Sequence, residues 1–274
     1  MKRKIGVAAL MAVMALGALT PAAFAQCTNI LIKFDADCFA YETDAFLSAV
    51  QPDGNQAWKS NIGSQLTVVG LATLFCSPLN SLVPDLTNPD PNQRKEYSFV
   101  WTGLTASGPL VNPPGSPATS ETTVGGTGKR WVTNYSGGHF YIYENQPADA
   151  PREGTPMPAN PPNATVPANF QNGTLILEGP LNGLTVSSLR SGANVWSGTF
   201  TTTYSFTGGT MFNSTVLVGW NYGAGLPLQG NWCLKYPSGC TPQGYTGHAD
   251  GQWLPASPTV VKHSTWGAIK ELYR

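Results

Sequence analysis

Charged residues are scarce in this chain of 274 residues. Asp, Glu, Lys and Arg make up 11% of the sequence, less than half of the ~25% that is typical of soluble domains. The 15 basic and 15 acidic residues balance and form no basic patch, so the composition argues against nucleic acid as a partner. Contact with water must instead come from Thr, Ser, Asn, Gln and Gly, which suits a β-protein with hydroxyl-rich strand faces.

Residues that carry catalysis or bind metals are also few, and they form no recognised motif. A Gly-x-Ser-x-Gly nucleophile motif is absent, and none of the three histidines (His139, His248 and His263) has a partner that the sequence identifies. Zinc-type Cys-x-x-Cys and His-x-x-x-His spacings are absent, and Asp35 and Asp37 lack the rest of a calcium loop. We therefore expect no metal and no cofactor, and catalytic and ligand-binding residues stay unknown at this stage.

Only one segment is apolar over a long run, and it lies at the N-terminus. Three positive charges in "MKRK" precede 16 apolar residues, "IGVAALMAVMALGALT", which are fewer than the ~20 that span a bilayer as a helix. Ala23-Phe24-Ala25 then gives the small-x-small pattern of a cleavage site. Residues 1–25 are predicted to be a bacterial-type signal peptide, so we expect a secreted, periplasmic or cell-surface protein with no transmembrane helix after signal removal. An uncleaved anchor is the weaker alternative.

The five cysteines all follow the predicted signal peptide. An exported chain meets an oxidising compartment, where disulfide bonds are expected. Cys233 and Cys240 flank "LKYPSG", in which Pro-Ser-Gly can turn the chain back, so we predict that these two pair. Cys27, Cys38 and Cys76 can supply at most one further bridge, and the sequence does not choose between them.

Residues 26–262 are dominated by strand patterns separated by glycine- and proline-rich turns. In "GTFTTTYSFTGG", Phe200, Thr202, Tyr204 and Phe206 share one face, and the intervening hydroxyl residues share the other. Gly137-Gly138 and Gly208-Gly209 are predicted to form hairpin turns. The pattern predicts a single antiparallel β-sandwich or barrel-like domain. A transmembrane barrel fits the alternation weakly, and the proline-rich connections argue against it.

Short sequence echoes accompany these turns. "TGLTAS" precedes "YSGGHFY", and "NGLTVS" precedes "FTGGTMF". The spacing between the parts differs, whereas a true repeat keeps a fixed period. Two explanations of the echoes therefore remain open: similar turn sequences that arose independently, and an internal duplication.

Two kinds of residue could bind or cleave a polysaccharide. Glycoside hydrolysis needs two carboxyl groups across a cleft, and Glu144 and Glu178, each late in a predicted strand, are the most plausible positions. Flat exposed aromatic rings could instead stack on sugars, although most aromatics in β-proteins fill the core. The tryptophans in or beside predicted strands are Trp101, Trp131, Trp196, Trp220, Trp232 and Trp253.

Residues 263–274, "HSTWGAIKELYR", predict a short C-terminal helix. Ser264 or Thr265 can cap it, and Trp266, Ile269 and Tyr273 then share one face. The ending "GYTGHADGQW…STWGAIKELYR" resembles a group of uncharacterised exported bacterial β-rich proteins that end in a TWGxIKxLYR-type segment. This resemblance implies export and a shared tail but no activity. The tail is either a sorting signal or a helix docked on the β domain.

These observations predict an exported protein with a structural or binding role at the cell exterior. Its expected partner is a surface glycan or another cell-envelope component. The alternative is a secreted carbohydrate-active enzyme on a β-sandwich. A cleft with two carboxylates would favour the enzyme, and a patch of exposed Trp or Tyr without that pair would favour glycan binding.

Overall fold

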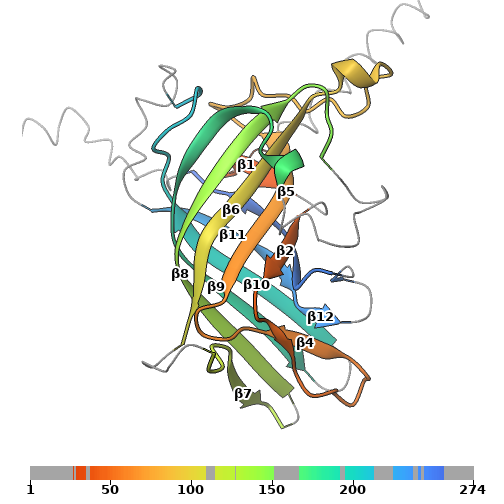
Figure 1. The fold of residues 1–274 in the computed structure, drawn as a ribbon, viewed down its shortest axis with the longest axis vertical. Coiled ribbons are helices and arrows are strands. Elements are labelled where there is room, and N and C mark those ends of the chain that lie inside the picture. Colours follow the sequence, from red (N-terminus) through yellow and green to blue (C-terminus); the bar gives the residue numbers. More distant parts are fainter. Residues whose placement is uncertain are drawn as a thin grey trace, which may run out of the picture.

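In the computed structural model, the alternating segments of the chain pair into antiparallel strands that close into a barrel of eight (Figure 1). The structure describes residues 27, 29–34, 38–108, 115–126, 128–150, 167–191, 195–212, 225–236, 240–241 and 244–255. The predicted signal peptide and the predicted C-terminal helix at 263–274 lie outside these residues, as do Asp35 and Asp37.

The sheet closes because its first and last strands pair with each other. The strands follow one another around the barrel as β1 (Ile32–Phe34), β13 (Gly247–Trp253), β11 (Leu226–Cys233), β10 (Val195–Tyr204), β9 (Thr174–Ser191), β8 (Gly128–Asn145), β6 (Glu96–Ser107) and β5 (Gln65–Phe75). Antiparallel pairing of β1 with β5 completes the ring. Of the two predicted architectures, the structure therefore forms the barrel, which leaves no free sheet edge along this ring.

The remaining elements lie beside the ring. Strand β2 (Phe39–Glu42) pairs with both β5 and β13, and β7 (Ser120–Val124) pairs with β8. A small sheet of β3 (Phe46–Leu47), β4 (Gln56–Lys59) and β12 (Lys235–Tyr236) lies at the lower end in Figure 1. The two 3-10 helices are η1 (Pro91–Gln93) and η2 (Ala168–Phe170). None of the described helices has the length and apolar character needed to cross a membrane.

Aromatic side chains fill the interior of the barrel. The predicted alternation in β10 is confirmed, because Phe200, Tyr204 and Phe206 are buried while Thr201 faces out. Phe34 lies at the centre of the cluster, with its ring centroid 5.0 Å from that of Phe99. Edge-to-face packing of such rings adds about 0.5–1.5 kcal/mol per pair beyond the burial of their area.

Most of the tryptophans belong to this core, as predicted. Four of the six that the sequence places in or beside strands are buried: Trp101, Trp131, Trp232 and Trp253. Trp196 is partly exposed and stacks on Trp131 at a centroid distance of 5.2 Å. Trp220 lies outside the described residues.

The Gly137-Gly138 pair does not form the predicted hairpin. Both residues have positive φ, +69° and +114°, but they lie inside the continuous 18-residue strand β8. Gly103 in β6 and Gly183 in β9 also have positive φ, at +70° and +78°. A residue with a side chain rarely adopts this conformation, and glycine in a strand commonly marks a bulge or bend. The pair therefore bends a long strand instead of reversing it.

Two sequence echoes meet at this bend. Gly103 and Gly183 belong to "TGLTAS" and "NGLTVS", which lie on β6 and β9, the two neighbours of β8. In each echo the leucine after the glycine, Leu104 or Leu184, is buried in the core. Each echo thus places a positive-φ glycine followed by a buried leucine at the point where its strand bends. The Gly208-Gly209 step leads into residues 213–224, which lie outside the described part of the chain, and Gly208 forms a bridge to Glu178.

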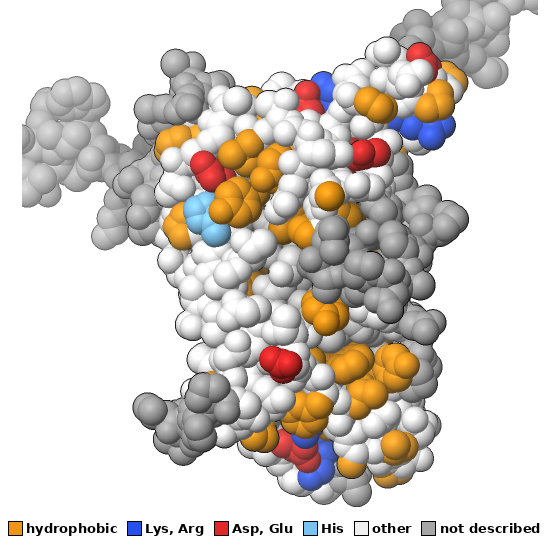
Figure 2. Space-filling model, viewed as in Figure 1, with side chains coloured by type: hydrophobic (Ala, Val, Ile, Leu, Met, Phe, Trp, Pro, Cys, Tyr) orange, Lys and Arg blue, Asp and Glu red, His pale blue; other side chains and the backbone are white. Residues whose placement is uncertain are grey.

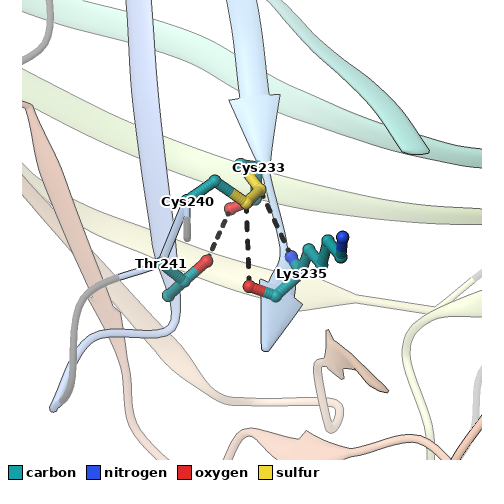
Figure 3. The surroundings of a disulfide bond; sticks show 4 residues. All are labelled: Cys233, Lys235, Cys240 and Thr241. Atoms are coloured by element: carbon teal, nitrogen blue, oxygen red, sulfur yellow. Dashed lines mark hydrogen bonds between the residues drawn. A yellow bond between two sulfur atoms is a disulfide. The ribbon is translucent and has the colours of Figure 1, made fainter. Parts of the chain in front are cut away.

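Two disulfides lie in the described part of the chain. Cys233 and Cys240 are joined, with their Cα atoms 6.0 Å apart, at the end of β11 (Figure 3). The Thr241 hydroxyl donates a hydrogen bond to the Cys233 carbonyl at 3.3 Å beside this bridge. The second bridge joins Cys27 to Cys76, which the sequence left open. It lies next to the β1–β5 seam, where the Cys76 amide donates to the Leu31 carbonyl at 2.9 Å.

The two bridges should differ in their contribution to stability. Cys27 and Cys76 are 49 positions apart, and Cys233 and Cys240 are 7 apart, so chain entropy predicts losses of roughly 4 and roughly 2.5 kcal/mol when each pair is replaced by serine. Urea unfolding of the Cys27→Ser/Cys76→Ser and Cys233→Ser/Cys240→Ser variants measures both values. An equal loss, or a larger loss for the short loop, would contradict this ranking.

Candidate functional site

Three ring-bearing side chains line up on the outer face of β8. His139, Tyr141 and Tyr143 alternate with Phe140 and Ile142, which are fully buried in the core. Because successive strand residues point to opposite faces, the first three share the outer face of the barrel. Figure 2 shows this region at upper left, where hydrophobic side chains gather beside a histidine and an acidic side chain. We call these three residues the aromatic row.

Glu178 on β9 places a carboxylate beside the aromatic row. It pairs in register with Tyr141, and its Oε2 lies 3.6 Å from Nε2 of His139. The side chains of His139 and Glu178 remain 36% and 30% exposed. The bridge to Gly208 fixes the backbone of Glu178 from the other side. The site therefore combines an accessible carboxylate, an imidazole and aromatic faces on two rigid strands.

The rings of the row lie close to one another. The centroids of His139 and Tyr141 are 4.6 Å apart, and their planes are inclined by 33°. Burial raises the pKa of Tyr143, and the negative charges that Tyr141 and Glu178 can carry raise it further. The Tyr143 phenol is therefore a neutral hydrogen-bonding group near pH 7, and both tyrosines carry apolar ring faces. Such a surface can stack on the C–H face of a sugar ring while Glu178 accepts hydrogen bonds from hydroxyls.

Glu144 and Glu178, the two carboxylates proposed from the sequence, are not brought together. Glu178 lies opposite Tyr141, whereas Glu144 is three residues further along β8 and so faces the other side of the sheet. Glu144 Oε1 instead lies 3.2 Å from Nζ of Lys95. Burial, followed by the adjacent Glu144, raises the pKa of the Tyr97 hydroxyl. Glu144 thus belongs to a separate group at the end of the barrel.

The sequence did contain a signal for the aromatic row. In "HFYIYE", His and Tyr alternate with the apolar residues Phe and Ile. One face of a strand formed by this stretch therefore carries His139, Tyr141 and Tyr143. Exposed Trp or Tyr was the expected signal for glycan binding, but this stretch of β8 was not singled out from the sequence. Glu178 could not be assigned to the site without the register between β8 and β9.

A second cluster of functional groups is buried at the lower end of the barrel. Oε2 of Glu42 accepts hydrogen bonds from the hydroxyls of Ser60, at 2.8 Å, and Tyr135, at 2.9 Å. The Ser60 amide donates to the Thr119 hydroxyl at 2.8 Å, and that hydroxyl lies 2.7 Å from the hydroxyl of Thr133. Glu42 is only 6% exposed, so this cluster is closed to a ligand from solvent.

The carboxyl of Glu42 is satisfied on one side only. Its Oε1 is buried and has no hydrogen-bond partner among the described residues. Burial raises the pKa of Glu42 from 4.5 to about 7, although the hydrogen bonds from Ser60 and Tyr135 oppose the shift. The site therefore holds a proton that an exposed glutamate would release at lower pH.

Comparison with protein-family models, curated proteins and solved structures finds no match to this chain. The similarity of the C-terminal segment to exported β-rich proteins therefore stays a prediction. In the described part of the chain, no three His, Cys, Asp or Glu side chains are grouped so that they could hold a metal ion.

The titration of Glu42 should make stability depend on pH. A pKa of about 7 in the folded chain against 4.5 unfolded means that the folded state holds the proton more tightly. This stabilisation is complete below pH 4.5 and is lost as the pH rises through 7, a change of about 3 kcal/mol. Urea unfolding between pH 4.5 and 8.5 should show this loss in the native protein and a flatter profile in Glu42→Gln.

A second variant separates this effect from general damage to the fold. Tyr135→Phe removes a hydrogen bond that lowers the pKa of Glu42, so the steep part of its stability profile should move to higher pH. Parallel pH profiles for the native protein and Glu42→Gln would show that Glu42 does not control the dependence.

Proposed function

We propose that this protein is exported and binds a glycan of the cell exterior through the aromatic row and Glu178. The observation that carries the proposal is the alignment of His139, Tyr141 and Tyr143 on the outer face of one strand, with a carboxylate in register. A sugar ring has an apolar C–H face and a rim of hydroxyls, so it needs both a flat aromatic surface and polar acceptors. The aromatic row and Glu178 offer that combination.

The supporting strands favour a preorganised site. Strands β8 and β9 are each 18 residues long and pair with one another along most of their length. Sites on paired strands hold side chains more precisely than sites on loops. Little conformational entropy should therefore be lost when a ligand stacks on the row.

The positions of Glu144 and Glu178 favour binding over hydrolysis by this pair. A glycosidase needs two carboxyl groups about 5–10 Å apart on either side of the bond that it cleaves. Glu144 and Glu178 lie on opposite faces of the sheet, so they cannot flank one ligand. A structural role without a ligand is the outcome to be excluded by experiment.

Export is supported by two features. The predicted signal peptide ends at Ala25, directly before the first cysteine-containing segment of the mature chain. Two disulfides, Cys27–Cys76 and Cys233–Cys240, suit an oxidising compartment such as the periplasm or the extracellular medium.

Replacing the tyrosines should weaken glycan binding without unfolding the protein. The double variant Tyr141→Ala/Tyr143→Ala should bind at least ~30-fold more weakly, since truncation of an aromatic anchor commonly costs about 2 kcal/mol or more. Calorimetry with soluble cell-wall oligosaccharides measures the affinity. Tyr236→Ala is the matched control, because Tyr236 is a partly exposed tyrosine on β12 outside the row. Equal losses in both variants, or no glycan binding by the native protein, would refute the proposal.

Cleavage after Ala25 can be tested directly. The exported protein should have the intact mass of residues 26–274, and Ala25→Arg should block cleavage because the peptidase requires a small residue at this position. Mass spectrometry of the culture medium and of the periplasmic fraction gives the result. An exported native chain that retains residues 1–25 would show that the segment is an anchor.

A further inference from the structure

A groove of about 510 Å³ crosses the outer face of four strands, β10, β11, β13 and β1. It lies on the side of the barrel opposite the aromatic row, because four strand steps separate β8 from β13 in either direction around the ring. The groove is therefore distinct from the site proposed above.

The floor of the groove follows from the packing of the core. Phe200 pairs with Gly230, Gly230 with Gly251, and Gly251 with Phe34. A Cβ on either glycine would approach the Phe200 ring within 3 Å, so this row of residues faces inward. Since the pleat moves inward-facing Cα atoms toward the core, the row leaves a trough on the outer face.

Polar side chains form the two walls of the trough. The outward-facing residues on either side of the floor are Lys33, Thr199, Thr201, Gln229, Asn231, Asp250 and Gln252. Thr201, Gln229 and Gln252 pair across three strands, as do Thr199, Asn231 and Asp250. Within the described part of the chain, the threonine, glutamine and asparagine side chains of these walls make no hydrogen bond. Their donors and acceptors are thus available to a ligand.

We infer that this groove is a second carbohydrate site, which binds an oligosaccharide through hydrogen bonds from side-chain amides, hydroxyls and Asp250. Hydroxyls and amides each offer both donors and acceptors, which match the hydroxyls of a sugar. Four strands at a spacing of ~4.8 Å give the trough a length of ~14 Å, enough for a short oligosaccharide lying across the strands.

Other ligand classes fit this surface less well. A peptide that adds to a sheet needs a free strand edge, but the backbones of these four strands are paired on both sides. A phosphate-rich chain would need several cations, whereas the residues that line the groove include one cation, Lys33, and one carboxylate, Asp250. A neutral polyhydroxylated ligand is the class that the lining favours.

Nuclear magnetic resonance can test the two sites separately. Soluble xylo-, cello- and chito-oligosaccharides of four to six units, titrated to ~10 mM into ¹⁵N-labelled protein, cover affinities down to the millimolar range. At least one series should shift the side-chain amide signals of Gln229, Asn231 and Gln252. Gln229→Ala/Asn231→Ala should weaken that binding at least tenfold, whereas Tyr141→Ala/Tyr143→Ala should leave it unchanged.

A matched control and clear failures complete the experiment. Thr207→Ala, an exposed threonine outside the groove, should bind like the native protein, and thermal unfolding should show that every variant is folded. The inference is overturned if no series shifts the three amide signals of the native protein, or if the Gln252 signal of Gln229→Ala/Asn231→Ala still shifts with unchanged affinity. Failure of the aromatic row alone would leave these signals responsive, so the two sites fail independently.

Discussion

The fold depends on fitting large aromatic rings into a barrel of only eight strands. A barrel of this size has an interior that side chains just fill, and here Phe34 and Phe200 occupy it with Trp101 and Trp253. Gly230 and Gly251 make room for the two phenylalanine rings, because any side chain there would collide with them. The same row reaches β1, which has three residues and pairs with both neighbours to close the ring. The same residues therefore close the barrel and pack its core. The Cys27–Cys76 disulfide lies next to this closure.

A second set of glycines determines how the long strands curve. Gly103, Gly138 and Gly183 lie on three adjacent strands and have positive φ, so β6, β8 and β9 bend at the same level. A Cβ on Gly138 would lie 2.7 Å from the side chain of Leu104. The bend also shifts the alternation of β8, because Tyr135 faces the interior below it and Phe140 faces the interior above it. Without this shift, His139 and Tyr141 would point into the core instead of forming a surface.

The sequence predicts local features such as strand alternation, but it does not predict which distant strands pair. The alternation of Phe200, Tyr204 and Phe206 with threonines predicted a strand and its buried face, because the period of two is a local property. The hairpin predicted at Gly137-Gly138 is wrong, because positive φ occurs in a bulge as well as in a hairpin turn. The closure of the ring and the hydrogen bond between Glu42 and Tyr135, 93 positions apart, depend on register, which one sequence does not specify. For the same reason, Glu178 could be proposed as a functional residue but not placed beside Tyr141.

A filled interior has a consequence for function. Many barrels of this size hold a small ligand inside, but in this protein aromatic side chains occupy the interior. Glu42 and its hydroxyl partners are buried at the lower end of the barrel. In the proposed function, recognition would then fall to the outer face, where paired strands present side chains in fixed rows. The aromatic row and the groove lie on opposite sides of the barrel, so the two proposed sites would contact different parts of a polysaccharide network. If both proposed sites bind glycan, a binding role and a structural role would follow from the same barrel.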